Sequence, residues 1–121
     1  MNATAVFEPL SKLFRGDAER MHRALEIFER ITRQDLERMD EAWAVRDWPA
    51  LGRLAHRTKS GCLQIGETAA AEGLAAIELS SSSADETDAV SKNFAATRAE
   101  LDQVIERVAA FLANKDGAGE K

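Results

Sequence analysis

An apolar residue recurs at every third or fourth position along most of this chain, and that period restricts the fold more than any other feature of the sequence. It is clearest in the stretch 51–66, where one face of a helix would carry Leu51, Leu54, Ala55, Thr58, Cys62 and Ile65. Strands would instead need a sustained alternation of apolar and polar residues between turns, and the sequence contains none. The period therefore predicts an all-helical protein.

Residues that favour helix ends divide this pattern into one short helix and four long ones. Asp17 and Asp47 suit N-caps, Pro49 suits a first turn, and Gly66 suits the left-handed position that follows a helix. The expected helices cover about 9–14, 17–45, 47–65, 67–80 and 83–113, the last opening with the capping-box pair Ser83 and Glu86. Short turns between them predict an up-down-up-down four-helix bundle over residues 9–114, with flexible ends at 1–8 and 115–121.

The size and composition of the chain exclude several classes of protein. A length of 121 residues suits one domain with its own core, and a net charge of −5 argues against a general nucleic-acid binder. No apolar run approaches the roughly 18 residues of a membrane span, and the N-terminus lacks the pattern of a signal peptide. The single cysteine, Cys62, lies in the apolar stripe and is expected in the core. We therefore expect a cytoplasmic monomer that folds without a disulfide or a metal and does not insert into a membrane.

His56 is the unusual residue of the stretch 51–66. It lies about 150° from the centre of the apolar stripe, so its imidazole is expected to point to solvent. Its neighbours on that side of the helix are expected to be Gly52, Lys59, Ser60 and Leu63. A lone polar ring on the open side of a packed helix is a candidate functional group.

Cationic side chains gather around this histidine in an otherwise acidic protein. Arg53, Arg57 and Lys59 lie close to it in sequence, and they suit a phosphoryl group because each cation offsets its negative charge. A histidine imidazole is largely neutral at pH 7, so a ring nitrogen can attack a phosphoryl group without a strong base. The plain alternative is a solvated helix face whose charges make weak surface ion pairs.

The sequence around His56 resembles the histidine-containing phosphotransfer (HPt) domain family. The segment Ala55-His56-Arg57-Thr58-Lys59 is followed by Ile65-Gly66, Leu74 and Ile77-Glu78, in the order of that family's signature. The upstream pairs Phe14 and Asp17, Leu25 and Phe28, and Asp47 and Leu51 also fit its usual layout. The resemblance covers almost the whole chain as architecture, whereas the specific motif is short.

The resemblance implies a four-helix bundle in which His56 is phosphorylated and Lys59 assists near the phosphate. The residues expected to contact the partner are Gly52, Arg53, Arg57, Ser60 and Leu63. The implied partner is the receiver domain of a hybrid sensor kinase or of a response regulator. That receiver supplies the Mg²⁺, so the chain needs no cofactor and no metal of its own. Because the sequence has no glycine-rich phosphate loop or nucleotide motif, we expect a phosphoryl carrier rather than an autonomous enzyme.

Three positions depart from the family pattern. Ser60 replaces the usual glycine one turn after the histidine, Leu63 stands where small residues are common, and Thr58 replaces a leucine. The Ser60 hydroxyl could bond the imidazole or a phosphate oxygen, and the Thr58 hydroxyl could bond its own helix backbone. These changes leave open a second function, a docking module (a pseudo-HPt) that binds a receiver or kinase without phosphotransfer. A third, a di-metal bundle suggested by Glu19 and His22, would need a second such pair and two further glutamates.

Overall fold

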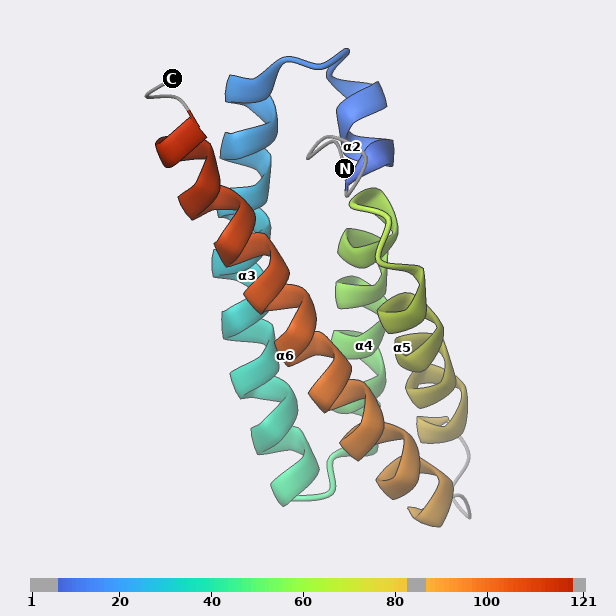
Figure 1. Ribbon diagram of the computed structural model, residues 1–121. Coiled ribbons are helices and arrows are strands. Elements are labelled where there is room, and N and C mark those ends of the chain that lie inside the picture. The colour runs from blue at the N-terminus through green and yellow to red at the C-terminus, as the bar shows by residue number, and fades with distance from the viewer. Residues whose placement is uncertain (1–6, 83–86, 119–121) are drawn as a thin grey trace.

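A computed structural model describes residues 7–82 and 87–118 of the chain. All regular secondary structure over these residues is helical, which confirms the predicted fold class. The helices are α2 (Glu8–Leu13), α3 (Ala18–Ala44), α4 (Trp48–Gln64), α5 (Thr68–Ser81) and α6 (Thr87–Ala118) (Figure 1). None of the described helices combines the length and the apolar character that crossing a membrane requires.

The four long helices pack side by side, and each runs opposite to the one before it in the chain (Figure 1). α3 contacts α4 and α6, and α5 contacts the same two helices, so the four elements close into a ring around a shared interior. The short helix α2 lies at one end, beside the turn from α4 to α5. Its Pro9 is so near that turn that a Cβ on Gly66 would lie 3.0 Å from the proline Cδ. Helix α2 therefore covers the end of the bundle opposite the turn between α3 and α4.

The ends of α3 and α4 follow the sequence signals. The Asp17 carboxylate accepts a hydrogen bond from the Arg20 backbone N–H at 3.2 Å, and Asp47 accepts one from the Ala50 N–H at 3.2 Å. Gly66 follows α4 with a φ of +83°, a left-handed conformation that a residue without a side chain adopts at little cost. The predicted caps are confirmed, and they determine where α4 begins and ends.

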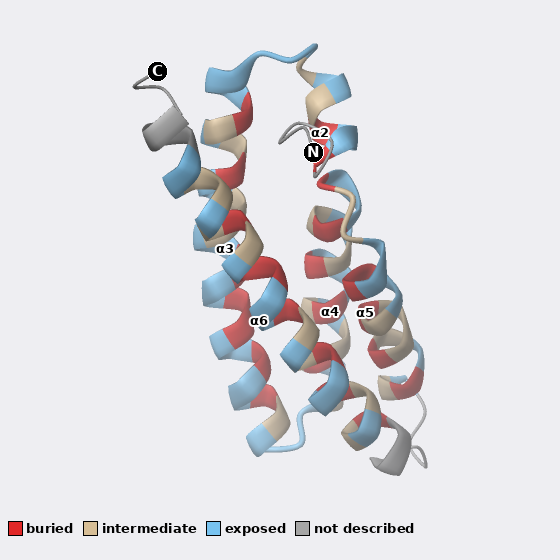
Figure 2. Cartoon of the chain, in the orientation of Figure 1, coloured by how far each residue is buried: buried red, intermediate tan, exposed pale blue. Residues whose placement is uncertain are grey.

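The predicted apolar stripe of α4 faces the interior of the bundle (Figure 2). Its members Leu51, Ala55, Thr58, Cys62 and Ile65 are buried, and Leu54 is half-buried. Their buried neighbours come from every other long helix and include Leu25, Leu36, Met39, Leu74, Ile77, Leu101, Val104 and Val108. Burying a large aliphatic side chain stabilises a fold by about 1.5–3 kcal/mol relative to exposing it. A helix anchored by several such residues keeps its opposite face outward.

Aromatic residues close the bundle at the turn between α3 and α4. The Trp43 ring stacks on Phe94 of α6 with centroids 5.0 Å apart, and Trp48 tilts against Trp43 at 5.7 Å. Arg46, in the turn itself, lies with its guanidinium over both tryptophan rings. Both tryptophans therefore report on the end of the bundle that lies farthest from α2.

The start of the chain departs from the prediction of a flexible segment at residues 1–8. Phe7 is fully buried, with its ring edge-on to Phe111 at a centroid distance of 5.3 Å, and Glu8 already belongs to α2. A single aromatic residue before a short helix has no periodic neighbours, so nothing in the pattern marks it as core. The packed domain therefore begins earlier than expected.

The last helix also departs from its predicted boundaries. α6 continues to Ala118, whereas the last apolar residues suggested an end near Ala113. A helix can continue past its last buried residue. The residues that follow Ala113, among them Lys115 and Asp116, include no proline that would end it. The predicted capping pair, Ser83 and Glu86, lies outside the described residues.

Candidate functional site

α4 presents His56 to solvent, which confirms the orientation predicted from the helical period. The side chain is 64% exposed, while the opposite face of α4 lies in the core. The ring is nonetheless held, because Nδ1 lies 2.7 Å from Oε2 of Glu78 on α5. An exposed imidazole with a fixed orientation can be approached from outside the bundle and can meet a reactant at a defined angle.

Glu78 also binds Lys59, and so it joins the two residues at the centre of the predicted site. Lys59 Nζ lies 2.9 Å from Oε1, so each oxygen of the carboxylate has its own partner. The hydrogen bond from Lys59, reinforced by the contact with His56, holds the pKa of Glu78 below its ordinary value although partial desolvation opposes the shift. The carboxylate is therefore ionised at neutral pH. Glu78 had no predicted role, because the sequence marks it only as part of the family signature.

The contact with Glu78 determines which nitrogen of His56 is available. An ionised carboxylate accepts hydrogen bonds and donates none, so the ring hydrogen lies on Nδ1. A neutral ring then has its free lone pair on Nε2. The geometry thus leaves Nε2 as the ring nitrogen that is free to form a new bond, an assignment that the sequence does not allow.

A hollow of about 720 Å³ lies beside His56, where α4 meets α5. Its lining comprises Pro49, Gly52, Arg53, His56, Glu78, Ser81 and Ser82. Gly52 allows the two helices to approach here, because a Cβ at this position would overlap the Ser81 Oγ. The Ser81 hydroxyl donates instead to the backbone oxygen of Glu78 at 3.1 Å. Gly52 is therefore a packing residue of the site as well as part of its surface.

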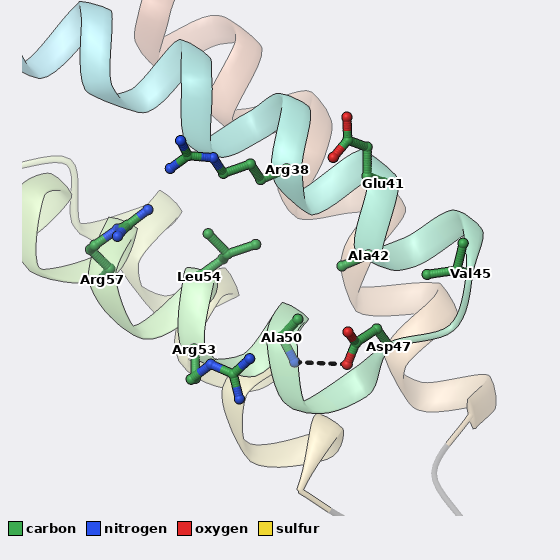
Figure 3. A pocket seen from close by; sticks show the side chains of 9 residues that line it. All are labelled: Arg38, Glu41, Ala42, Val45, Asp47, Ala50, Arg53, Leu54 and Arg57. Atoms are coloured by element: carbon green, nitrogen blue, oxygen red, sulfur yellow. Dashed lines mark hydrogen bonds between the residues drawn. The ribbon is translucent and has the colours of Figure 1, made fainter.

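The three cations of α4 point in three different directions. Arg57 turns towards α3, where its Nε and Nη2 both donate to the buried carboxylate of Asp35, and this hydrogen bonding raises the Arg57 pKa. Lys59 turns towards α5 and binds Glu78. Arg53 lies between, where it lines both the hollow and a groove on the α3 side (Figure 3). The sequence predicts one basic patch. Each residue is rotated by about 100° around a helix, so Arg57 and Lys59, two residues apart, lie on opposite sides of α4, and the patch is divided.

The groove between α3 and α4 has a volume of about 590 Å³ (Figure 3). Its lining comprises Arg38, Glu41, Ala42, Val45, Asp47, Ala50, Arg53, Leu54 and Arg57. Arg38 shares the carboxylate of Asp35 with Arg57, at an N–O distance of 3.7 Å from Arg38. The arginines here face a similar number of carboxylates, so the groove is close to electrically neutral and does not favour an anion.

The sequence of the chain matches the model of one protein family. The family model of the Hpt domain matches residues 23–111, a range that contains His56, Lys59 and Glu78. The chain belongs to the Hpt domain family. Hpt domains are phosphotransfer modules of two-component signalling, and they interact with receiver domains in phosphorelays. Searches of curated proteins and of solved structures found no significant match.

Two exposed leucines lie next to the centre of this Hpt domain. Leu63 is 50% exposed, one turn after Lys59, and Ser60 beside it is exposed as well. Leu79 of α5 is 76% exposed and lines a second hollow together with Lys59. Leu79 was not predicted as a site residue from the sequence. Its position could have indicated exposure, because it falls outside the buried stripe of α5, which includes Ala70, Leu74 and Ile77.

Thr58 and Ser60, next to His56 on α4, do not form the hydrogen bonds that the sequence suggests for them. Thr58 is buried as predicted, but among the described residues its Oγ1 has no hydrogen-bond partner, so the expected bond to its own helix backbone is absent. The imidazole of His56 is bonded to Glu78 rather than to Ser60. For the ring the reason is competition, because the neighbouring helix supplies a charged acceptor. Nothing in the structure explains why the Thr58 hydroxyl does not bond to its own helix.

The structure also bears on the idea of a metal-binding bundle. Among the side chains that the structure describes, no three from His, Cys, Asp or Glu gather as possible ligands of one metal ion. His22, which suggested such a site, has its Nε2 3.4 Å from the carboxylate of Glu26 one turn further along α3. This is the spacing of an ordinary contact along one helix.

Proposed function

We propose that His56 of this Hpt domain accepts a phosphoryl group from the aspartate of one receiver domain and passes it to another. One observation supports the proposal above all others: the ring is exposed, yet Glu78 on the neighbouring helix fixes its orientation. An exposed side chain ordinarily samples several rotamers, and restricting them lowers the entropy lost when two reacting groups meet. The site therefore has the two properties that transfer between proteins requires, access and orientation.

The proposed transfer forms one bond and breaks one. The Nε2 lone pair attacks phosphorus, an N–P bond forms, and the P–O bond to the receiver aspartate breaks. The aspartate leaves as a carboxylate with the electron pair of that bond. Nδ1 keeps its hydrogen, so the phosphorylated ring is cationic, and the ionised Glu78 stabilises that charge. In this proposal Mg²⁺ belongs to the receiver, and the same steps in reverse deliver the group to the next receiver.

Lys59 supports the transfer in two ways in this proposal. It helps to keep Glu78 ionised and in place through the contact at 2.9 Å. It also stands on the exposed side of α4 next to His56, where a phosphoryl group would attract its ammonium. We expect Lys59→Ala to slow transfer severalfold while the far-UV circular dichroism stays unchanged, because the side chain is only partly buried. A transfer rate equal to that of the wild type would contradict this role.

The exposed leucines supply the apolar part of the proposed receiver-binding surface. Leu63 lies one turn after Lys59, Leu79 lines a hollow with Lys59, and docking would remove both leucines from water. We expect Leu79→Ser to raise the KM for a phosphorylated receiver and to leave labelling by a small-molecule phosphodonor unchanged. Leu13→Ser, at a site on α2 that is 69% exposed, is the matched control and should alter neither quantity.

The decisive test compares the two histidines of the chain. The purified protein is incubated with a phosphorylated receiver and Mg²⁺, and the label is examined for the acid lability and base stability of a phosphohistidine. We expect wild type and His22→Gln to be labelled and His56→Gln to remain unlabelled. Labelling of His56→Gln at the wild-type level would refute the proposal. Binding of the receiver without any label on His56 would favour the docking module instead.

A further inference from the structure

We propose that Arg53 is the residue that binds the phosphoryl group once His56 carries it; this inference rests on the proposed function. Arg53 precedes His56 by three residues on α4, a spacing that places two side chains next to each other on a helix. Both residues line the same hollow, about 720 Å³ in volume, at the junction with α5. The guanidinium therefore has room to move towards the ring without displacing a packed group.

The other two cations near His56 already have carboxylate partners. Lys59 is bound to Glu78 at 2.9 Å, and Arg57 is bound to the buried Asp35 on the opposite side of α4. Arg53 is exposed, and within the described part of the chain it makes no hydrogen bond or ion pair. Of the three cations, Arg53 is thus the one that binds a new anion without giving up a contact to a described residue.

The charges that face the hollow favour this assignment. Among the described residues that line it, the charged groups before phosphorylation are the Arg53 guanidinium and the Glu78 carboxylate, whose other oxygen binds Lys59. A phosphoryl group brings about one and a half to two negative charges at pH 7. Glu78 would repel that group, so a cation on the same hollow is needed to offset the repulsion. Arg53 meets the requirement, and its planar fork matches the spacing of two phosphoryl oxygens.

Gly52 contributes to the same arrangement. Because it has no side chain, α4 and α5 approach closely at the Ser81 hydroxyl, and no Cβ takes up space at this point of the lining. The lining includes the small side chains of Ser81 and Ser82, and the volume of about 720 Å³ leaves space for a phosphoryl group and a guanidinium together. The bonds of the transfer are unchanged by Arg53, which binds the group after the N–P bond has formed.

Phosphoramidate provides a test that needs no receiver. Its P–N bond breaks and ammonia leaves as the N–P bond to His56 forms, so the protein is labelled without any docking step. The acid dissociation of the attached phosphoryl group is then followed by ³¹P NMR, and the hydrolysis of the phosphohistidine is timed. The variants are Arg53→Gln, Arg53→Lys and the control Arg30→Gln, which removes the same charge from an exposed site of α3.

A nearby cation favours the more highly charged phosphoryl form, so its loss weakens acid dissociation. We expect Arg53→Gln to lower the acid dissociation constant of the phosphoryl group about threefold and to shorten the phosphohistidine lifetime by a similar factor. Arg30→Gln should keep the wild-type values. Arg53→Lys should lie between, since it keeps the charge and loses the fork. Equal constants for Arg53→Gln and wild type, or equal changes in both glutamine variants, would overturn the inference alone. An unlabelled His56 in the wild type would overturn the proposed function with it.

Discussion

Replacing Phe7 by alanine tests whether the core of this Hpt domain extends beyond the range that the family model matches. Phe7 precedes residue 23, where the match begins, yet its side chain is 0% exposed. Its ring meets Phe111 of α6 edge-on, with centroids 5.3 Å apart and planes at 84°. Truncating a buried phenylalanine costs about 3–5 kcal/mol. Because Phe111 is only half-buried, and the new cavity would open near the end of the bundle, we expect a loss near the lower limit, about 3 kcal/mol.

The expected loss converts into a large change in melting temperature. Unfolding entropies near 60 °C are about 2.1 cal/mol/K per residue, or about 0.25 kcal/mol/K for a chain of 121 residues. A loss of 3 kcal/mol then lowers the Tm by about 12 °C. The melt is followed by circular dichroism and by tryptophan fluorescence. Trp43 and Trp48 lie near the turn between α3 and α4, at the end opposite α2, so fluorescence reports loss of the whole bundle (Figure 1).

A matched control separates burial of Phe7 from any general sensitivity of α2. Leu13 lies in the same helix and is 69% exposed, so Leu13→Ala should change the stability by no more than about 0.5 kcal/mol. The variant Phe111→Ala tests the aromatic contact directly, and its coupling with Phe7→Ala should be about 0.5–1.5 kcal/mol. If Phe7→Ala melted at the wild-type temperature, the argument from burial would be refuted and the domain would begin after α2.

Three further results are expected. Thr58→Val removes a buried hydroxyl without a described partner and keeps the shape of the side chain, so it should raise the free energy of unfolding by about 1 kcal/mol in a urea titration; a decrease would mean that the hydroxyl is paired in solution. Burial raises the pKa of the Cys62 thiol to about 12, so iodoacetamide at pH 8 should label it only in denaturant, and labelling of the native protein at the rate of a free thiol would contradict this. The hydrogen bond from Lys59 is the main cause that lowers the pKa of Glu78 in the folded protein. The contacts of Glu78 therefore stabilise the fold above the unfolded pKa, and this stability is lost as the pH falls through the lower folded pKa. A carboxyl ¹³C titration of Glu78 should show a midpoint below that of an ordinary glutamate, and a higher midpoint in Lys59→Ala; equal midpoints in the two proteins would contradict this.

Much of the frame around His56 could be predicted because it depends on local rules. Asp47 and Gly66 mark the two ends of α4, and both positions follow from the hydrogen bonds that helix ends leave open. The helical period then determines which residues of α4 face the core, so the exposure of His56 and Leu63 could be read in advance. Each of these inferences uses residues within a few turns of one another.

Other features escaped prediction because they depend on isolated residues or on the absence of a partner. Phe7 is one buried ring outside any periodic run, and its contact with Phe111 joins opposite ends of the chain. Whether Thr58 bonds to its own backbone depends on a side-chain rotation that the sequence does not determine. The end of α6 at Ala118 lies beyond Leu112, the last large apolar residue of its stripe. In each case the local sequence pattern does not predict the feature, which depends on side-chain packing or on the continuation of the helix backbone.

The acidic partners of His56 and Arg57 lie between these two cases. His56 binds Glu78 and Arg57 binds Asp35, and in both pairs the residues are 22 positions apart, in opposite directions along the chain. Two antiparallel helices rise equally per residue, so residues equidistant from their connecting turn lie at the same height. The turn at Gly66 is close to midway between the first pair, and the turn before Asp47 is close to midway between the second. A sequence with well-marked turns therefore limits which acidic residue can reach which cation. Once it is known which neighbouring helix each cation of α4 faces, the turns determine the partner of each.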